Sequence, residues 1–243
     1  MSKLDLKNIT LYGVDTVDIE RQLKAFAICE SYAHFGAKKI VTNRGEEYVT
    51  DSGIEIIHTD EINSLHDYNH FNLKKMNDYF ETDFVMVAEH DGFILNPGAW
   101  DDNFLGYDFI GAPLLVDGVQ KVGNGGFSIR SKKLMALLQS DDTIQLGNKI
   151  DHRYAENEDW VICVVMREYL ESKGIRFAPA ELGHKFSLEN NRQYGNVWDG
   201  QFGYHGLRWT DISAWIDKNP QWNIHNPLDK KFPKDAPATG VAT

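Results

Sequence analysis

The chain has 243 residues, enough to bury a substantial core in one large domain or two small ones. Its hydrophobic share of 42% and charged share of 25% are those of an ordinary globular protein. A net charge of -11 argues against a protein that binds polyanions through its overall electrostatic field, although a local basic groove is compatible with that charge.

The first half of the chain alternates β-favouring runs with helical periodicity. We expect strands at residues 9–12, 39–42, 54–57 and 84–88, and helices at residues 17–35 and 68–80. Gly36 is expected to cap the first helix in a left-handed conformation. Strands separated by helices predict an α/β fold in which a mostly parallel, Rossmann-like mixed sheet is flanked by helices on both faces.

The second half is less regular. We expect a strand at 107–113, a glycine-rich loop from 122 that leads into a strand ending near 130, helices at 132–138 and 158–170, and an edge segment at 177–180. Asn, Pro, Lys and Asp dominate from residue 220 onward. The sequence therefore predicts one domain over 1–219 and a mobile tail over 220–243.

Three features of the sequence bear on the cellular location of the protein. The amino-terminal sequence MSKLDLKN lacks the apolar segment of a secretory leader, and no run of about 18 apolar residues occurs, so neither a signal peptide nor a membrane span is expected. Cys29 and Cys163 lie in apolar contexts without paired spacing and are expected to be buried free thiols. Together these features predict a cytoplasmic protein.

Two acids and a histidine, Glu89-His90-Asp91, stand where the apolar run 84–88 stops. Ligands of open α/β sheets collect at the carboxyl ends of strands. A carboxylate there must reach water or a cation, because its desolvation costs several kcal/mol or more. Two oxygen donors flanking one residue suit Mg²⁺ or Mn²⁺ holding a substrate phosphate, whereas the alternative is a cluster of caps and salt bridges at a strand end.

Six segments taken together resemble the GT-A class of nucleotide-sugar glycosyltransferases, and more narrowly a glycosyltransferase-like domain family. They are EHDGFIL, YDFIGAP, VGNGGFSIRS, NEDW, FAPAELGHKFSLE and FGYHG, and the resemblance covers roughly Ile9 to Trp209, most of the chain. The resemblance implies a GT-A-like fold, a nucleotide-sugar donor and a metal held by an acid-x-acid motif. This chain departs from the Asp-x-Asp pattern, so Glu89 contacts either the metal or the ribose of the donor.

The expected metal ligands are Asp91, Glu89 and His205. Departure of a nucleoside diphosphate places charge on the leaving oxygen, and a divalent cation such as Mn²⁺ or Mg²⁺ neutralises it most effectively. Asp91 is the expected direct ligand, and the resemblance implies a carboxyl-terminal histidine, which His205 in FGYHG matches. The alternative for His205 is an imidazole packed among aromatic residues.

The loop Asn124-Gly125-Gly126 permits close backbone approach by a large group. In enzymes that the chain resembles, such a loop lies under the donor sugar, and Asn124 is expected to bond a sugar hydroxyl. The alternative is a tight turn before a strand. Strand alternation predicts that Arg130 points away from the site.

Glu158 and Asp159 open a predicted helix, where acids are favourable against the helix dipole. The resemblance implies that Asp159 is the base of an inverting sugar transfer and that Glu158 contacts the acceptor or supports the base. Such a base takes the proton of the acceptor hydroxyl as it attacks the anomeric carbon.

The donor nucleoside is expected over the end of the first strand. Tyr12 would stack on the base, Gly13 would allow close approach and Asp15 would accept a hydrogen bond from base or ribose. Asn72 and Lys75 are weaker candidates for which a solvated helix face is the alternative. Three aromatic residues near FGYHG form either a sugar platform or part of the core: Trp198, Tyr204 and Trp209.

These features predict a metal-dependent glycosyltransferase that moves a sugar from a nucleoside diphosphate donor, expected to be UDP-linked, to a hydroxyl. A nucleotidyl or phosphoryl transferase, or a non-catalytic nucleotide- or carbohydrate-binding module, is the alternative. The acceptor is open among a glycan, a small molecule, a protein side chain and a modified nucleic-acid base. A local phosphate-binding patch for the last of these would comprise Lys121, Arg130, Lys132 and Lys133.

Overall fold

The computed structural model describes residues 2–44, 53–147, 156–190 and 194–225. At its centre is a six-stranded sheet, whose strands in spatial order are β3 (Glu55–His58), β2 (Ala33–Thr42), β1 (Leu4–Val14), β4 (Phe84–Ala88), β9 (Phe127–Ser131) and β6 (Phe109–Gly111). The first four are parallel, and β9 runs antiparallel to both of its neighbours.

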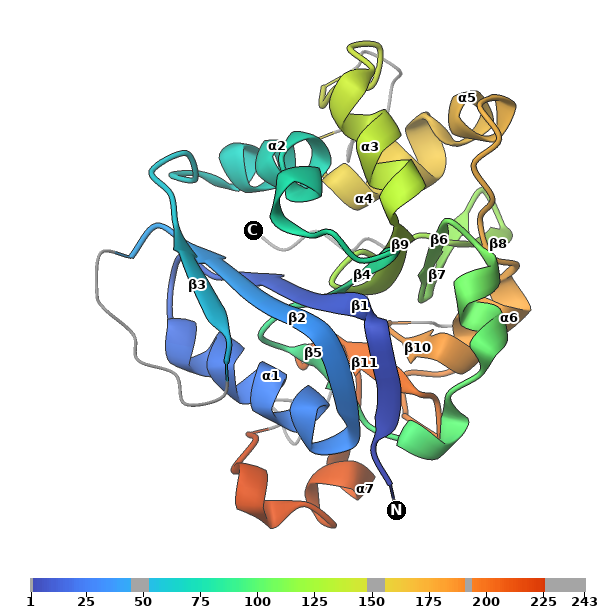
Figure 1. Ribbon diagram of the computed structural model, residues 1–243. Helices are drawn as coiled ribbons and strands as arrows, with labels where there is room; N and C mark the ends of the chain where they lie inside the picture. The colour runs from blue at the N-terminus through green and yellow to red at the C-terminus, as the bar shows by residue number, and fades with distance from the viewer. Residues whose placement is uncertain (1, 45–52, 148–155, 191–193, 226–243) are drawn as a thin grey trace.

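Helices lie on both sides of this sheet (Figure 1). One side carries α1 (Ile19–Tyr32), and the other carries α2 (Leu65–Lys74), α3 (Lys132–Ser140) and α4 (Glu158–Trp160). Side chains of Asp18, Ser64 and Ser131 cap the amino ends of α1, α2 and α3 by accepting backbone hydrogen bonds. The prediction of an α/β fold with a mixed central sheet flanked by helices is confirmed.

Two smaller sheets and three short helices complete the described part of the chain. A three-stranded sheet contains β10 (Ser187–Leu188), β11 (Gly203–His205) and β5 (Gly92–Ile94), and a hairpin contains β7 (Pro113–Val116) and β8 (Val119–Val122). The short helices are α5 (Arg167–Ser172), α6 (Ala180–Phe186) and α7 (Ser213–Ile216). Among the described residues, no helix is long and apolar enough to cross a membrane.

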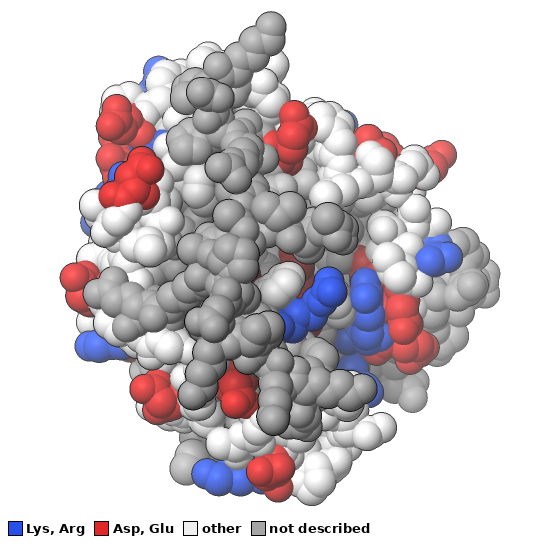
Figure 2. All heavy atoms as spheres, turned by 180° about the vertical axis from the view of Figure 1, so that it is seen from behind, with Lys and Arg blue, Asp and Glu red and all other residues white. Residues whose placement is uncertain are grey.

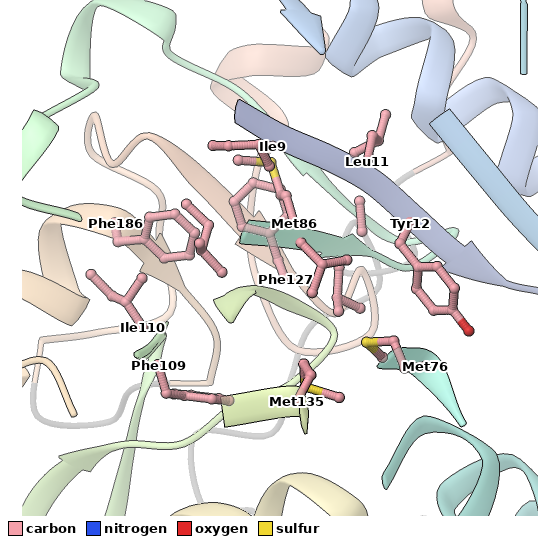
Figure 3. Packing of buried hydrophobic residues seen from close by; sticks show 14 of the residues in the cluster. Ile9, Leu11, Tyr12, Met76, Met86, Phe109, Ile110, Phe127, Met135 and Phe186 are labelled. Atoms are coloured by element: carbon pink, nitrogen blue, oxygen red, sulfur yellow. The ribbon is translucent and has the colours of Figure 1, made fainter. Parts of the chain in front are cut away.

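The central strands supply one continuous core. Ile9 and Leu11 of β1, Met86 of β4 and Phe127 of β9 are completely buried in it (Figure 3). Burying each such side chain stabilises the fold by about 1.5–3 kcal/mol. Cys29 and Cys163 are also buried and form no disulfide, as predicted.

Several predicted boundaries are wrong. β1 does not stop at Gly13, and α1 ends at Tyr32, where the chain turns directly into β2. Gly36 therefore lies within a strand, where a Cβ atom would stand 2.1 Å from the carbonyl oxygen of Lys7 on β1. Its small size serves strand pairing and not a helix cap. The predicted helix 68–80 starts earlier, as α2, and ends in a 3-10 turn at Met76–Tyr79.

The predicted helix 158–170 is interrupted. After α4 the backbone forms a π turn, Val161–Val165, in which Met166 N donates to Val161 O at 2.8 Å before α5 begins. This VICVV segment is rich in β-branched residues, which fit the regular α-helix poorly.

The β7–β8 hairpin was not predicted, although its turn carries the sequence Asp117-Gly118, both with positive φ. In the predicted tail, Pro220–Trp222 forms a helical turn and Trp222 packs against the core. The rest of that tail, residues 226–243, lies outside the described residues.

Candidate functional site

The Glu89-His90-Asp91 turn begins where β4 leaves the central sheet. Glu89 N donates to Gly126 O at 2.9 Å, which extends the β4–β9 pairing by one step. Gly92 N then donates to Glu89 O at 2.9 Å and closes the turn into β5. Within the turn, His90 Nδ1 lies 3.8 Å from Asp91 Oδ1. The two acids are thus presented at the carboxyl edge of β4, as predicted.

β11 brings His205 to this turn. It pairs antiparallel with β5 so that His205 stands opposite Gly92, and Gly206 N donates to Asp91 O at 3.0 Å. The imidazole Nε2 lies 3.3 Å from Glu89 Oε2 and 3.3 Å from Asp91 Oδ1. Ligand atoms of these three residues lie within 4.8 Å of one another. The structure therefore brings together the three residues that the sequence marks as metal ligands.

Two further side chains hold this cluster, and no role was predicted for either. The Tyr68 hydroxyl, on α2, donates to Glu89 Oε1. Glu189 follows β10, and its Oε2 lies 3.0 Å from His205 Nδ1. Glu189 ends one of the motifs singled out in the sequence, and its place at the end of a strand-like run was the available signal.

The cluster favours positive charge at its centre. Burial opposes the charged form of His205, but the carboxylates of Glu189 and Asp91 outweigh it and raise the pKa of His205 well above its ordinary value. Burial likewise opposes ionisation of Glu89 and Asp91, yet the neighbouring imidazolium holds the pKa of both carboxyls below their ordinary values. The carboxylates of Glu89, Asp91 and Glu189 therefore form a site that stabilises positive charge, and a divalent ion bound there would take the place of the proton on His205 Nε2.

The donor set fits a small divalent ion. Bonds of about 2.1 Å place adjacent ligands of an octahedral ion about 3.0 Å apart and opposite ligands about 4.2 Å apart. The two contacts of 3.3 Å from Nε2 are close to the first of these separations, and the ligand atoms of the set all lie within 4.8 Å of one another. Carboxylates suit both Mg²⁺ and Mn²⁺, whereas an imidazole suits transition metals, so the mixed set favours Mn²⁺.

The glycine loop before β9 separates this cluster from a second acidic pair. A Cβ atom at Gly126 would stand 2.2 Å from His205 Nε2, and one at Gly125 would stand 2.9 Å from the Cβ atom of Asp159. Close approach by the protein's own side chains therefore requires both glycines. The Asn124 amide donates to Ala112 O at 3.2 Å, so it anchors the loop.

The second acidic pair consists of Glu158 and Asp159. Glu158 is ion-paired, whereas Asp159 accepts hydrogen bonds from the backbone. Asp159 Oδ2 accepts a hydrogen bond from Gly125 N at 3.0 Å, and its Oδ1 accepts from Trp160 N at 2.7 Å. Burial, then the negative charges of Glu158 and Glu189, raise the pKa of Asp159 to about 8. A carboxyl with that pKa can exchange a proton near neutral pH.

Arg130 points toward the glycine loop and Glu158, so the prediction that it points away from the site is wrong. Its side chain is completely buried, and Nη2 lies 2.7 Å from Glu158 Oε1. The same nitrogen donates to Gly125 O at 3.4 Å. Arg130 thereby joins the glycine loop to the start of α4 and compensates the buried charge of Glu158.

The predicted nucleoside site over the end of β1 is not formed by the residues proposed for it. Tyr12 is completely buried in the core and cannot stack on a base (Figure 3). A Cβ atom at Gly13 would stand 2.4 Å from Gln22 Nε2, so a neighbouring helix occupies the space expected for a ligand. The buried Asp15 carboxylate accepts from Val17 N at 2.7 Å and forms an ion pair with Arg21 at 2.6 Å.

The other predicted contacts are divided between core and surface. Asn72 is buried, and its Oδ1 has no hydrogen-bond partner among the described residues. Lys75 is a half-exposed residue that lies 3.7 Å from Glu61. Tyr204 is completely buried, so it is no platform for a sugar, whereas Trp198 and Trp209 are partly exposed.

Three of the four residues of the predicted basic patch are engaged with other parts of the protein. Arg130 is buried, Lys132 Nζ donates to Asn77 O at 2.8 Å, and Lys133 lies 3.5 Å from Asp108. On the face shown in Figure 2, basic side chains of the described residues lie beside acidic ones.

Comparison with known proteins was made by sequence and by structure. No curated protein sequence matches the chain. Among solved structures, the bifunctional IspDF from Campylobacter jejuni aligns with a TM-score of 0.39 and 15% identity, over 55% of this chain and 43% of that chain. A family model described as "Protein of unknown function (DUF5672)" matches residues 51–205, a segment that contains the three clustered ligands, Asp159 and Glu189. The protein is therefore a member of the DUF5672 family.

Proposed function

We propose that the protein is a metal-dependent glycosyltransferase that moves a sugar from a nucleoside diphosphate donor, with UDP as the expected nucleotide, to a hydroxyl acceptor with inversion. The observation that carries this proposal is the cluster of Glu89, Asp91 and His205 at the carboxyl edge of β4. Asp159 stands across the glycine loop from it, with a pKa raised to about 8.

Glu89, Asp91 and His205 would hold Mn²⁺ or Mg²⁺. Such a cation, when bound, neutralises the charge that develops on the departing diphosphate. Tyr68 donates a hydrogen bond to Glu89 Oε1, so Oε2, which lies 3.3 Å from His205 Nε2, would be the oxygen available to a cation. The half-buried setting strengthens these electrostatic interactions relative to bulk water.

Asp159 would act as the base. The acceptor oxygen forms a bond to the anomeric carbon while the bond from that carbon to the diphosphate oxygen breaks, and its electron pair leaves with the diphosphate. The hydroxyl proton passes to Asp159. Each carboxylate oxygen accepts one backbone N–H here, so each retains a lone pair for that proton. Glu158 is ion-paired with Arg130, and its negative charge helps to keep the pKa of Asp159 high.

The test is consumption of nucleotide sugars by the full chain in the presence of Mn²⁺. Wild-type protein should slowly hydrolyse one uridine diphosphate sugar, and Asp91→Asn should lower the rate by about 100-fold or more, because it removes a charged ligand at the leaving group. Asp217→Asn, the same change at an exposed acid after α7, is the matched control and should leave the rate unchanged.

Four results would contradict the proposal. Equal donor consumption by wild type and Asp91→Asn, or consumption that survives removal of metal by a chelator, would remove the metal-dependent mechanism. Donor binding without any turnover would favour a nucleotide- or carbohydrate-binding module. Release of pyrophosphate from a nucleoside triphosphate would favour a nucleotidyl transferase.

A further inference from the structure

Glu189 is placed next to His205 by strand pairing. β10 pairs in parallel with β11, with Leu188 beside Tyr204, so the residues that follow in each strand emerge together. Glu189 Oε2 and His205 Nδ1 lie 3.0 Å apart. The side chains are 14% and 16% exposed, respectively.

These two atoms depend on each other. Neither Glu189 Oε2 nor His205 Nδ1 has a well-directed hydrogen bond to any described residue, although both are removed from water. A buried carboxylate oxygen without a donor costs several kcal/mol, and this ring nitrogen is the donor within reach. The contact is therefore an electrostatic pairing, in which the two atoms lie 3.0 Å apart.

The opposite nitrogen of the ring faces the predicted metal ligands. His205 Nε2 is 3.3 Å from both Glu89 Oε2 and Asp91 Oδ1. A carboxylate at Nδ1 keeps a proton on that nitrogen and leaves the lone pair of Nε2 for a metal. The same partner fixes the plane of the ring and increases the basicity of the ligand nitrogen.

A purely structural role makes different predictions. In that role His205 stays an imidazolium that neutralises three carboxylates, and Glu189 contributes only to stability. Loss of its charge would then change unfolding but not the strength or the ligand environment of a bound cation.

We propose that Glu189 is a positioning residue of the metal site, which holds His205 so that Nε2 is directed at the ion shared with Glu89 and Asp91. This inference rests on the metal site of the proposed function. It adds a specific partner that follows β10 to proposed ligands that lie in the turn after β4 and in β11, and it does not require any particular donor sugar.

The test is a titration of the full-length protein with Mn²⁺ alone, followed by electron paramagnetic resonance. Glu189→Ala should weaken Mn²⁺ binding by about 10–100-fold. Glu189→Gln keeps an oxygen that can accept from Nδ1, so it should recover part of that loss. Glu181→Gln, an exposed glutamate in the first turn of α6, is the matched control and should bind like the wild type.

A second readout reports on the histidine itself. Electron spin echo modulation from a ring nitrogen should accompany Mn²⁺ bound to the wild type, weaken in Glu189→Ala and return in Glu189→Gln. Unchanged affinity and unchanged nitrogen coupling in both variants would overturn the role of Glu189 while leaving the metal site in place. Failure of wild-type protein to bind Mn²⁺ would overturn both the metal site and this inference.

Discussion

The Asp159 carboxylate is held in an unusual combination of surroundings. Two backbone N–H groups, from Gly125 and Trp160, stabilise its charge, while burial and the charges of Glu158 and Glu189 oppose it. Burial and these negative charges outweigh the two hydrogen bonds and raise the pKa of Asp159 to about 8. A group that is partly protonated at neutral pH suits transfer of a proton and serves poorly as a simple helix cap.

Asp159→Asn should abolish sugar transfer while leaving donor binding intact. A base contributes about 10²–10⁴-fold to rate, and asparagine cannot take the proton. In the wild type, transfer should rise with pH through about 8, because only the ionised carboxyl accepts a proton. The pH–rate profile and donor titration calorimetry measure both effects, and a variant that transfers at the wild-type rate would remove Asp159 from this role.

The same pKa has a signed effect on stability in metal-free protein. A carboxyl whose folded pKa is raised contributes stability below its unfolded pKa of about 4, and that contribution is lost as pH rises through the folded value of about 8. Asp159→Asn should therefore lose less stability than wild type between those pH values. Urea unfolding in the presence of a chelator measures this difference.

At the residue scale, the sequence predicts which side chains belong to the candidate site better than it predicts where each side chain points. Glu89, Asp91 and His205 are rare residue types at a strand end and in a glycine-flanked loop, so their chemistry alone marks them. Tyr12 and Arg130 were misplaced because their strands are buried on both faces, where alternation does not distinguish a core side from a ligand side.

At the element scale, the loop from 123 to 126 sets the spacing between the metal ligands and Asp159. Gly126→Ala would introduce a Cβ atom 2.2 Å from His205 Nε2, a distance that forces the imidazole to move. We expect at least about a tenfold loss of Mn²⁺ affinity, since a displaced ligand forfeits its bond to the ion.

Gly106→Ala is the matched control, because a Cβ atom there meets no atom within 4 Å. Titration with Mn²⁺ and circular dichroism of both variants separate loss of the ion from loss of the fold. If Gly126→Ala bound Mn²⁺ like Gly106→Ala, His205 would not be a ligand in the conformation described.

Elements with one strong local signal were predicted well, and those shaped by tertiary packing were not. β4 was predicted with its observed bounds because five consecutive residues suit a buried strand. Gly36 reads locally as a helix cap, but pairing of β2 with β1 overrides that preference. The π turn at Val161–Val165 depends on an extra residue in one helical turn, which helical periodicity does not reveal.

At the scale of the whole molecule, the three-stranded sheet ties the carboxyl-terminal part of the chain to the central sheet. β5 follows directly from β4, and β11 joins β5 to β10. His205 therefore contacts Glu89 across a sequence separation of 116 residues. An ion bound by both would be lost when the fold opens.

Mn²⁺ should consequently raise the melting temperature. At a free concentration 100 times its dissociation constant, a ligand of the folded state stabilises it by about 2.7 kcal/mol. For a chain of this size that corresponds to about 5–10 °C. Differential scanning calorimetry of wild type and His205→Asn measures the effect, and an equal rise in both proteins would show that the ion binds elsewhere.

The 116-residue separation has a consequence for biosynthesis. The turn that contains Glu89 and Asp91 is synthesised long before β11, so a nascent chain that ends before residue 205 carries two of the three clustered side chains. Truncated products that stop short of residue 205 lack the imidazole of His205 and therefore one ligand of the proposed metal site. The proposed metal site can therefore form only after residue 205 has been synthesised.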